Sequence, residues 1–245
     1  MEKKFFLGGQ DREMIAIREI LERNSIAFED KKIGWGAKAS AYAEEIEAAV
    51  VAGFIPVLVE LEIDITVPQG TVVVDHHNER AGEPASILQV LSLLGIEPTR
   101  HDLLIAANDS GYIPAMEAMG ATPEEIAEIR LGDRNAQGVT PEMEAEAERA
   151  IAQAEVIGKL TIVEMAHSKT ATVADRLYGK ADQLLILSED GEANFFGNGA
   201  VCSELDKKFG GWGGGAGFGK KDGLGYWGGN PKHDELVAWL VEKLA

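Results

Sequence analysis

One run of residues, Thr71–Asn78, constrains the fold of this chain more than any other. It reads TVVVDHHN, so four β-forming residues end abruptly in one acid and two imidazoles. β-Formers without polar alternation are typical of a strand that is buried on both faces, as in a parallel sheet. In open α/β sheets, ligands bind at the carboxyl ends of the strands. Asp75, His76 and His77 are therefore predicted to form a metal or acid–base site at that edge.

Acidic residues also follow the other strands predicted in the first half of the chain. Segments 3–7 and 54–59 are the predicted strands, and each is followed by carboxylates. If both are parallel neighbours of 71–74, their acids converge on one edge of the sheet. The sequence leaves open which of Glu60 and Glu62 points inward. The candidates are Asp11, Glu13, Glu60 or Glu62, and Asp109.

The chemistry of this set favours a hard divalent cation. Oxygen and nitrogen ligands without thiolate suit Mn²⁺ or Mg²⁺, with Zn²⁺ or Co²⁺ as alternatives. Several carboxylates bridged by metal ions are the layout for two-metal hydrolysis. Each acid also has a structural explanation, since Asp11 can cap a helix and Asp109 can cap a turn. Glu60 or Glu62 can be an ordinary solvated loop residue.

Charge and composition limit the partners of the chain. Its 245 residues carry a formal net charge of −18, from 41 acidic and 23 basic residues. This balance argues against a long nucleic-acid duplex, which needs stripes of Lys and Arg, but it allows a short or mononucleotide substrate. The single cysteine, Cys202, predicts a reducing, cytoplasmic setting. No apolar run predicts a signal peptide or a membrane span, and a homodimer stays open.

A second α/β pattern begins after Gly158. Between the two halves lies a predicted helix, 142–157, which alternates Glu and Ala and has few large apolar residues. We interpret it as a solvated connector. The strands and helices predicted beyond it are 160–165, 170–178, 183–187, 193–196 and 234–244. The predicted organisation is a catalytic domain over 1–140, a connector over 141–158 and a smaller α/β domain over 159–245.

The tract 210–229 is rich in glycine and contains aromatic residues, among them Trp212. Glycines let backbone N–H groups approach an anion closely, and aromatic rings can stack on a base. A surface loop with its aromatic residues folded onto the core is the alternative. Lys169, which follows the predicted strand 160–165, is either a phosphate contact or part of a helix-capping turn.

These motifs resemble the DHH phosphoesterase superfamily. TVVVDHH over Thr71–His77 matches its name-giving motif, and Asn108–Gly111 (NDSG) is similar to its next motif. Phe209–Gly219 is similar to the Gly-rich motif of its associated C-terminal domain. The resemblance implies a parallel-sheet catalytic domain joined by a helix to a smaller α/β domain, with an active-site cleft between them. It implies a Mn²⁺-dependent hydrolase of a small phosphorylated, nucleotide-like substrate: a short oligonucleotide, a cyclic dinucleotide or a nucleotide bisphosphate.

The resemblance also implies roles for individual residues. The implied catalytic residues are Asp75, His76, His77 and Asp109. The implied ligands of one or two Mn²⁺ ions, with Mg²⁺ or Co²⁺ as alternatives, are Asp11, Glu13, Glu60, Asp75, His76 and Asp109. The implied substrate contacts are His77, Lys169, Trp212, Gly213, Gly214 and Gly215.

The chain departs from the family pattern at three places. No His accompanies Asp11 and Glu13 after the first strand, and Glu60 or Glu62 stands where the second motif has Asp. Ala216 replaces the His that ends the Gly-rich motif. These departures favour one alternative, a non-catalytic nucleotide-binding or sensor protein on a degenerate DHH fold.

Overall fold

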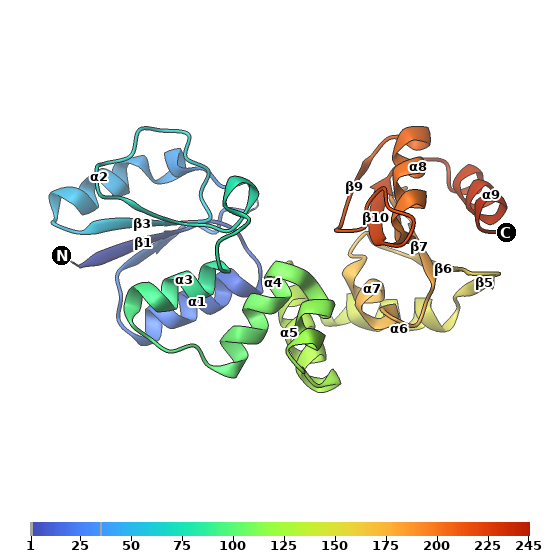
Figure 1. Ribbon diagram of the computed structural model, residues 1–245, viewed down its shortest axis with the longest axis horizontal. Coiled ribbons are helices and arrows are strands. Elements are labelled where there is room, and N and C mark those ends of the chain that lie inside the picture. Colours follow the sequence, from blue (N-terminus) through green and yellow to red (C-terminus); the bar gives the residue numbers. More distant parts are fainter. Residues whose placement is uncertain (1, 35) are drawn as a thin grey trace. The chain divides into compact units, whose positions relative to one another are not determined.

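The computed structural model describes residues 2–34 and 36–245, which form two compact units divided after Gly138 (Figure 1). The first unit contains a four-stranded sheet, and the second contains a six-stranded sheet. Among the helices of the described residues, none combines the length and the apolar character that crossing a bilayer requires. The expected α/β class is confirmed.

The sheet of the first unit is entirely parallel, as the sequence predicts. Its strand order is β2-β1-β3-β4. In the register, Leu7 lies opposite Val59, and Val59 lies opposite Val74. These are the last residues of their strands, so three strands end at one level. The strands are β1 (Lys3–Leu7), β2 (Phe28–Asp30), β3 (Ile55–Val59) and β4 (Val72–Val74).

Helices cover both faces of this sheet. α2 lies over one face and α1 and α3 lie over the other (Figure 1). Phe6 and Leu58 are fully buried against Tyr42 and Ile46 on the α2 side. The helices are α1 (Arg12–Arg23), α2 (Ala43–Val51), α3 (Ser86–Leu94), α4 (Arg100–Ala118) and α5 (Pro123–Ala136), with short 3-10 turns η1 (Ala39–Tyr42) and η2 (Asn78–Arg80).

One detail of the first unit differs from the sequence prediction. β4 is an edge strand of the described sheet, and only Val74 is fully buried, so the predicted burial of this strand on both faces is wrong. α4 kinks just after Asp109, because Gly111 and Tyr112 leave helical geometry before the helix resumes at Ile113.

The sheet of the second unit is mixed, with the order β5-β6-β7-β8-β10-β9. Only β6 and β7 pair in parallel. One core cluster includes Leu205 of α8 and Leu236 of α9, and another includes Ala147 of α6 and Val173 of α7. The elements are α6 (Pro141–Ala152), β5 (Glu155–Ile157), β6 (Leu160–Met165), α7 (Ala171–Leu177), β7 (Gln183–Ser188), β8 (Ala193–Asn198), α8 (Gly199–Phe209), β9 (Trp212–Gly214), β10 (Leu224–Gly229) and α9 (His233–Leu244).

The predicted connector over 141–158 belongs to the core of the second unit. α6 ends at Ala152, and Glu155–Ile157 form β5, which pairs with β6. Ala147 and Ala150 are buried against the sheet. Because alanine side chains are small, the helix lies close to the strands, and a sequence with few large apolar residues still builds a buried helix face.

The glycine-rich tract forms part of the sheet. Trp212 lies opposite Gly228 across the β9–β10 pair, and Tyr226 lies opposite Gly214. A Cβ atom on Gly228 would lie 2.5 Å from the Trp212 ring, and one on Gly214 would lie 2.9 Å from the Tyr226 hydroxyl. The two glycines therefore make room for an aromatic ring that crosses the neighbouring strand.

Side chains buried in the middle of the first sheet contribute to the free energy of unfolding of the first unit. Val57 on β3 is fully buried, whereas Val51 on α2 is 88% exposed. We expect Val57→Ala to lower the free energy of unfolding by about 2 kcal/mol, because it removes buried methyl groups and leaves a cavity. Val51→Ala should change it by less than about 0.5 kcal/mol. Urea unfolding of both variants measures the difference, and equal effects would contradict the described core.

Candidate metal centre

Four segments bring polar side chains to the carboxyl edge of the first sheet. The residues after β1 lead to Asp11 at the start of α1, and Glu60 directly follows β3. Asp75, His76 and His77 directly follow β4, and Asp109 comes from the part of α4 that precedes the kink. The common level at which β1, β3 and β4 end is the reason that segments far apart in the sequence meet here.

His76 lies at the middle of the group. Its Nε2 atom is 2.6 Å from Asp109 Oδ2, 3.6 Å from Glu60 Oε1 and 3.7 Å from Glu13 Oε2. Among the described residues, these four atoms and Asp11 Oδ2 are buried without an aligned hydrogen-bond partner. Leaving a buried polar atom unpaired is costly. Five such atoms that are all ligand types for a hard cation fit a metal ion well.

The carboxylates of α1 are held by one oxygen each. Asp11 Oδ1 accepts a hydrogen bond from the Met14 backbone N–H at 2.8 Å. Asp11 is therefore the N-cap of α1, the structural role that the sequence allowed for it. Glu13 Oε1 accepts one from the Ile87 backbone N–H at 3.0 Å, at the start of α3. In both residues the second oxygen is buried without an aligned hydrogen-bond partner among the described residues. Such outer hydrogen bonds orient metal ligands.

Glu60, rather than Glu62, belongs to this group. The Glu60 side chain is 7% exposed and lies near His76, whereas the Glu62 side chain is 61% exposed and lies near Lys38. Glu60 has a φ of 52°, in the left-handed region that non-glycine residues rarely adopt. Strained backbone of this kind is concentrated at functional sites. Gly8 makes the turn possible, because a Cβ there would lie 2.5 Å from the Glu60 carbonyl oxygen.

Asp75 and His77 contact each other at this edge, and their implied catalytic and ligand roles stay predictions. Ligand atoms of Glu60, His76, His77 and Asp109 lie within 4.8 Å of one another, and this set does not include Asp75. Asp75 Oδ1 instead accepts a hydrogen bond from the His77 backbone N–H at 2.9 Å and lies 3.0 Å from His77 Nδ1. Asp75 therefore orients the imidazole of His77, which was expected to contact substrate and lies among the ligand atoms.

Ser86 also lies beside this group of side chains, and the sequence did not predict it. Ser86 is fully buried at the start of α3, and its hydroxyl has no aligned hydrogen-bond partner among the described residues. Burial alone would raise the pKa of the Glu60 carboxyl, but His76, Glu13 and Ser86 beside it lower that pKa instead. The only sequence signal for Ser86 was its place just after Pro84, at the start of a helix.

Burial and neighbouring charges shift the pKa values of this group. Burial raises the pKa of Asp11 to about 7 and that of Glu13 to about 8, with further contributions from neighbouring carboxylates. Asp109, Glu13 and Glu60 together raise the pKa of His76 to about 12. Without a bound cation the group therefore holds protons, because so many buried carboxylates cannot all be ionised side by side.

The predicted substrate contacts in the sequence after Gly158 all lie in the second unit. Lys169 precedes α7, and its backbone N–H donates to His167 Nδ1 at 3.2 Å. Trp212, Gly213 and Gly214 form β9, and Gly215 follows it with a φ of 94°. The Trp212 side chain is about half exposed, as is Tyr226 of the neighbouring strand.

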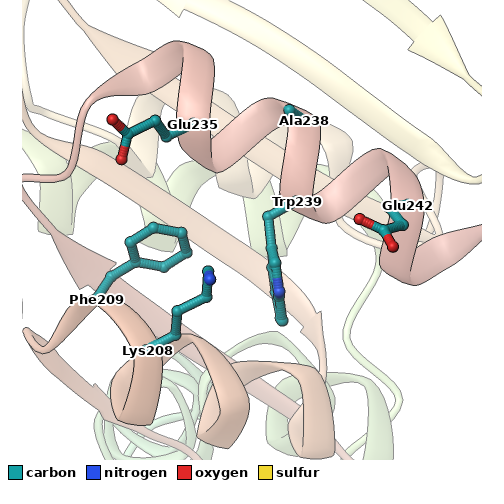
Figure 2. A pocket seen from close by; sticks show the side chains of 6 residues that line it. All are labelled: Lys208, Phe209, Glu235, Ala238, Trp239 and Glu242. Atoms are coloured by element: carbon teal, nitrogen blue, oxygen red, sulfur yellow. The ribbon is translucent and has the colours of Figure 1, made fainter.

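A hollow of about 530 Å³ also lies in the second unit, between the end of α8 and α9. Figure 2 shows the side chain of Lys208 between the rings of Phe209 and Trp239, with Glu235 and Glu242 on α9. Within the described part of the chain, no group suited to hold a metal ion lies there. The described ligand atoms that converge on one another lie instead at the edge of the first sheet.

No family model matches the sequence, and no curated protein matches it. The structure is similar to that of a pGpG-specific phosphodiesterase, PggH from Vibrio cholerae, with a TM-score of 0.50 and 13% identity over 99% of this chain and 98% of that chain. It also matches exonuclease RecJ bound to manganese, with a TM-score of 0.43 and 13% identity over 98% of this chain and 89% of that chain.

RecJ from Thermus thermophilus in complex with Mg²⁺ matches with a TM-score of 0.45 and 14% identity, over 99% of this chain and 49% of that chain. The likeness to PggH covers nearly the full length of both chains, so the two share a fold. The expected two-domain α/β architecture is thereby confirmed.

The titration of the centre predicts how stability depends on pH. We expect the unfolding temperature of the metal-free protein to fall as the pH rises from about 5 to about 8. The pKa of Asp11 rises from 3.8 to about 7 on folding and that of Glu13 from 4.5 to about 8. Ionising these carboxyls therefore costs more in the folded state.

Thermal unfolding in the presence of a chelator measures this effect. Glu13→Gln keeps an oxygen acceptor for Ile87 but cannot ionise, so its unfolding temperature should fall less over the same range. An unfolding temperature of the parent protein that stays constant or rises between these pH values would contradict the described burial of the carboxyls.

Proposed function

We propose that this chain is a divalent-metal-dependent phosphoesterase that hydrolyses a small phosphorylated, nucleotide-like substrate. One observation carries the proposal, the convergence of five buried ligand atoms without aligned hydrogen-bond partners at the carboxyl edge of a parallel sheet. The whole-chain fold likeness to a pGpG-specific phosphodiesterase supports phosphoester chemistry. We assign catalysis to the first unit and substrate binding to the second.

The metal ion would be held by Glu13, Glu60, His76 and Asp109, with Asp11 and His77 beside them. Carboxylate and imidazole ligands suit Mn²⁺, with Mg²⁺ or Co²⁺ as alternatives, and the number of carboxylates is sufficient for one or two ions. When bound, such an ion supplies an activated water molecule and neutralises negative charge on a phosphoryl group.

The protein's own groups prepare the centre. Asp75 favours the His77 tautomer with a proton on Nδ1, because a carboxylate can only accept there. In that tautomer Nε2 of His77 carries the lone pair that can bind a ligand. We further propose that residues of the second unit bind the substrate. The half-exposed Trp212 ring would stack on a nucleobase, and Lys169 with the backbone of Gly213–Gly215 would contact phosphate.

Turnover of defined substrates tests the function. The parent protein with Mn²⁺ should cleave at least one of a cyclic dinucleotide, a linear dinucleotide, a short oligonucleotide and a nucleotide bisphosphate. Asp109→Asn should lower the rate by at least about 100-fold, because it removes a charged ligand. Nucleotide binding without turnover would contradict hydrolysis and favour the non-catalytic sensor alternative.

A matched pair of variants tests the metal assignment. Glu60→Gln should weaken Mn²⁺ binding by about 10-fold or more, because it removes the charge of a buried ligand. Glu62→Gln should leave Mn²⁺ affinity unchanged, since Glu62 is exposed and lies beside Lys38. Isothermal titration calorimetry measures both. Equal affinities of the two variants would overturn the assignment of Glu60.

A further inference from the structure

α5 contains a buried ion pair that the proposed mechanism does not use. Arg130 Nη1 lies 2.8 Å from Asp133 Oδ2, and both side chains are only 9% exposed. Removing two charges from water is costly, and a buried pair of this kind often adds no more stability than apolar residues of the same size. We therefore look for the role of this ion pair in the groups that it contacts, rather than in the stability of the fold.

Asp133 contacts the start of α1. Its Oδ1 atom accepts a hydrogen bond from the Arg12 backbone N–H at 3.3 Å. Arg12 stands between Asp11 and Glu13 in the sequence, so this contact holds the backbone between two carboxylates of the proposed centre. α5 also packs closely there, because a Cβ on Gly132 would lie 3.0 Å from the Arg12 side chain.

Arg130 contacts α4 on both sides of Asp109. Its Nη1 donates to Asn108 Oδ1 at 2.9 Å, and its guanidinium carbon lies 4.6 Å from the centre of the Tyr112 ring. Asn108 directly precedes Asp109, and Tyr112 is the kink residue, with a φ of 59°. The guanidinium group therefore spans the stretch of backbone from which Asp109 reaches His76.

We infer that the Arg130–Asp133 pair is a positioning device for the metal centre, which fixes the start of α1 and the kink of α4 at one distance from each other. The inference rests on the proposed function. Neither residue is a ligand; each acts through the neighbours of Asp11, Glu13 and Asp109. A planar guanidinium group suits this task because its donors have a fixed geometry, which a lysine ammonium group lacks.

Arg130→Lys tests the inference in the full chain, because it keeps the charge and removes the planar geometry. We expect Mn²⁺ affinity to fall by about 10-fold, the effect typical of groups that orient metal ligands. The electron paramagnetic resonance spectrum of the bound Mn²⁺ should change as well, since it reports the ligand geometry. Arg18→Lys is the matched control, because Arg18 pairs with the buried Asp30 in the same unit. It should leave both readouts unchanged.

A second variant separates positioning from folding. Asn108→Ala removes one contact of Arg130 and leaves the ion pair in place, so it should weaken Mn²⁺ binding while the chain stays folded. The variant that combines Arg130→Lys with Asn108→Ala should bind Mn²⁺ no more weakly than Arg130→Lys alone. Both substitutions break the same contact, between Arg130 and Asn108. Parent-like Mn²⁺ affinity and spectrum in both single variants would overturn the inference alone. Absence of Mn²⁺ binding by the parent chain would overturn the proposed function and the inference with it.

Discussion

The in-register parallel pairing of β1, β3 and β4 is the constraint on which the rest of the structure depends. Because Leu7, Val59 and Val74 end their strands at the same level, the chain leaves the sheet three times at one place. Each exit carries polar residues, and α4 adds Asp109 from outside the sheet. The apolar layers on both sides of the sheet hold this arrangement against the repulsion of the acids that it gathers.

That repulsion gives the centre its chemical character. Several carboxylates share a small region from which water is largely excluded, and the imidazole of His76 is the cationic group that they surround. The pKa values of Asp11 and Glu13 are raised because an ionised carboxyl is unfavourable when it is buried beside other carboxylates and no metal cation is bound. A divalent cation would offset the same repulsion, which is the electrostatic reason for the metal ion that we propose at this edge.

The sequence predicted the parallel sheet, but it did not determine which side chains at the edge of that sheet point inward. The runs before Glu60 and Asp75 have β-branched residues and were recognisable as strands. The orientation of adjacent side chains was not, since a positive φ at Glu60 and the turn from Asp75 to His77 decide which group points inward. In the second unit, glycine concealed β9 and β10, because the aromatic rings that need those glycines lie on the partner strand and leave no local pattern.

The most direct test of the account is the anomalous diffraction of a crystal soaked in Mn²⁺. The account predicts an anomalous peak at the carboxyl edge of the first sheet, with Glu13, Glu60, His76 and Asp109 as protein ligands. The buried oxygens at that edge that have no aligned hydrogen-bond partner among the described residues would thereby gain a metal ligand bond. An edge without an anomalous peak, with His76 still paired to Asp109 and Mn²⁺ bound elsewhere, would contradict it.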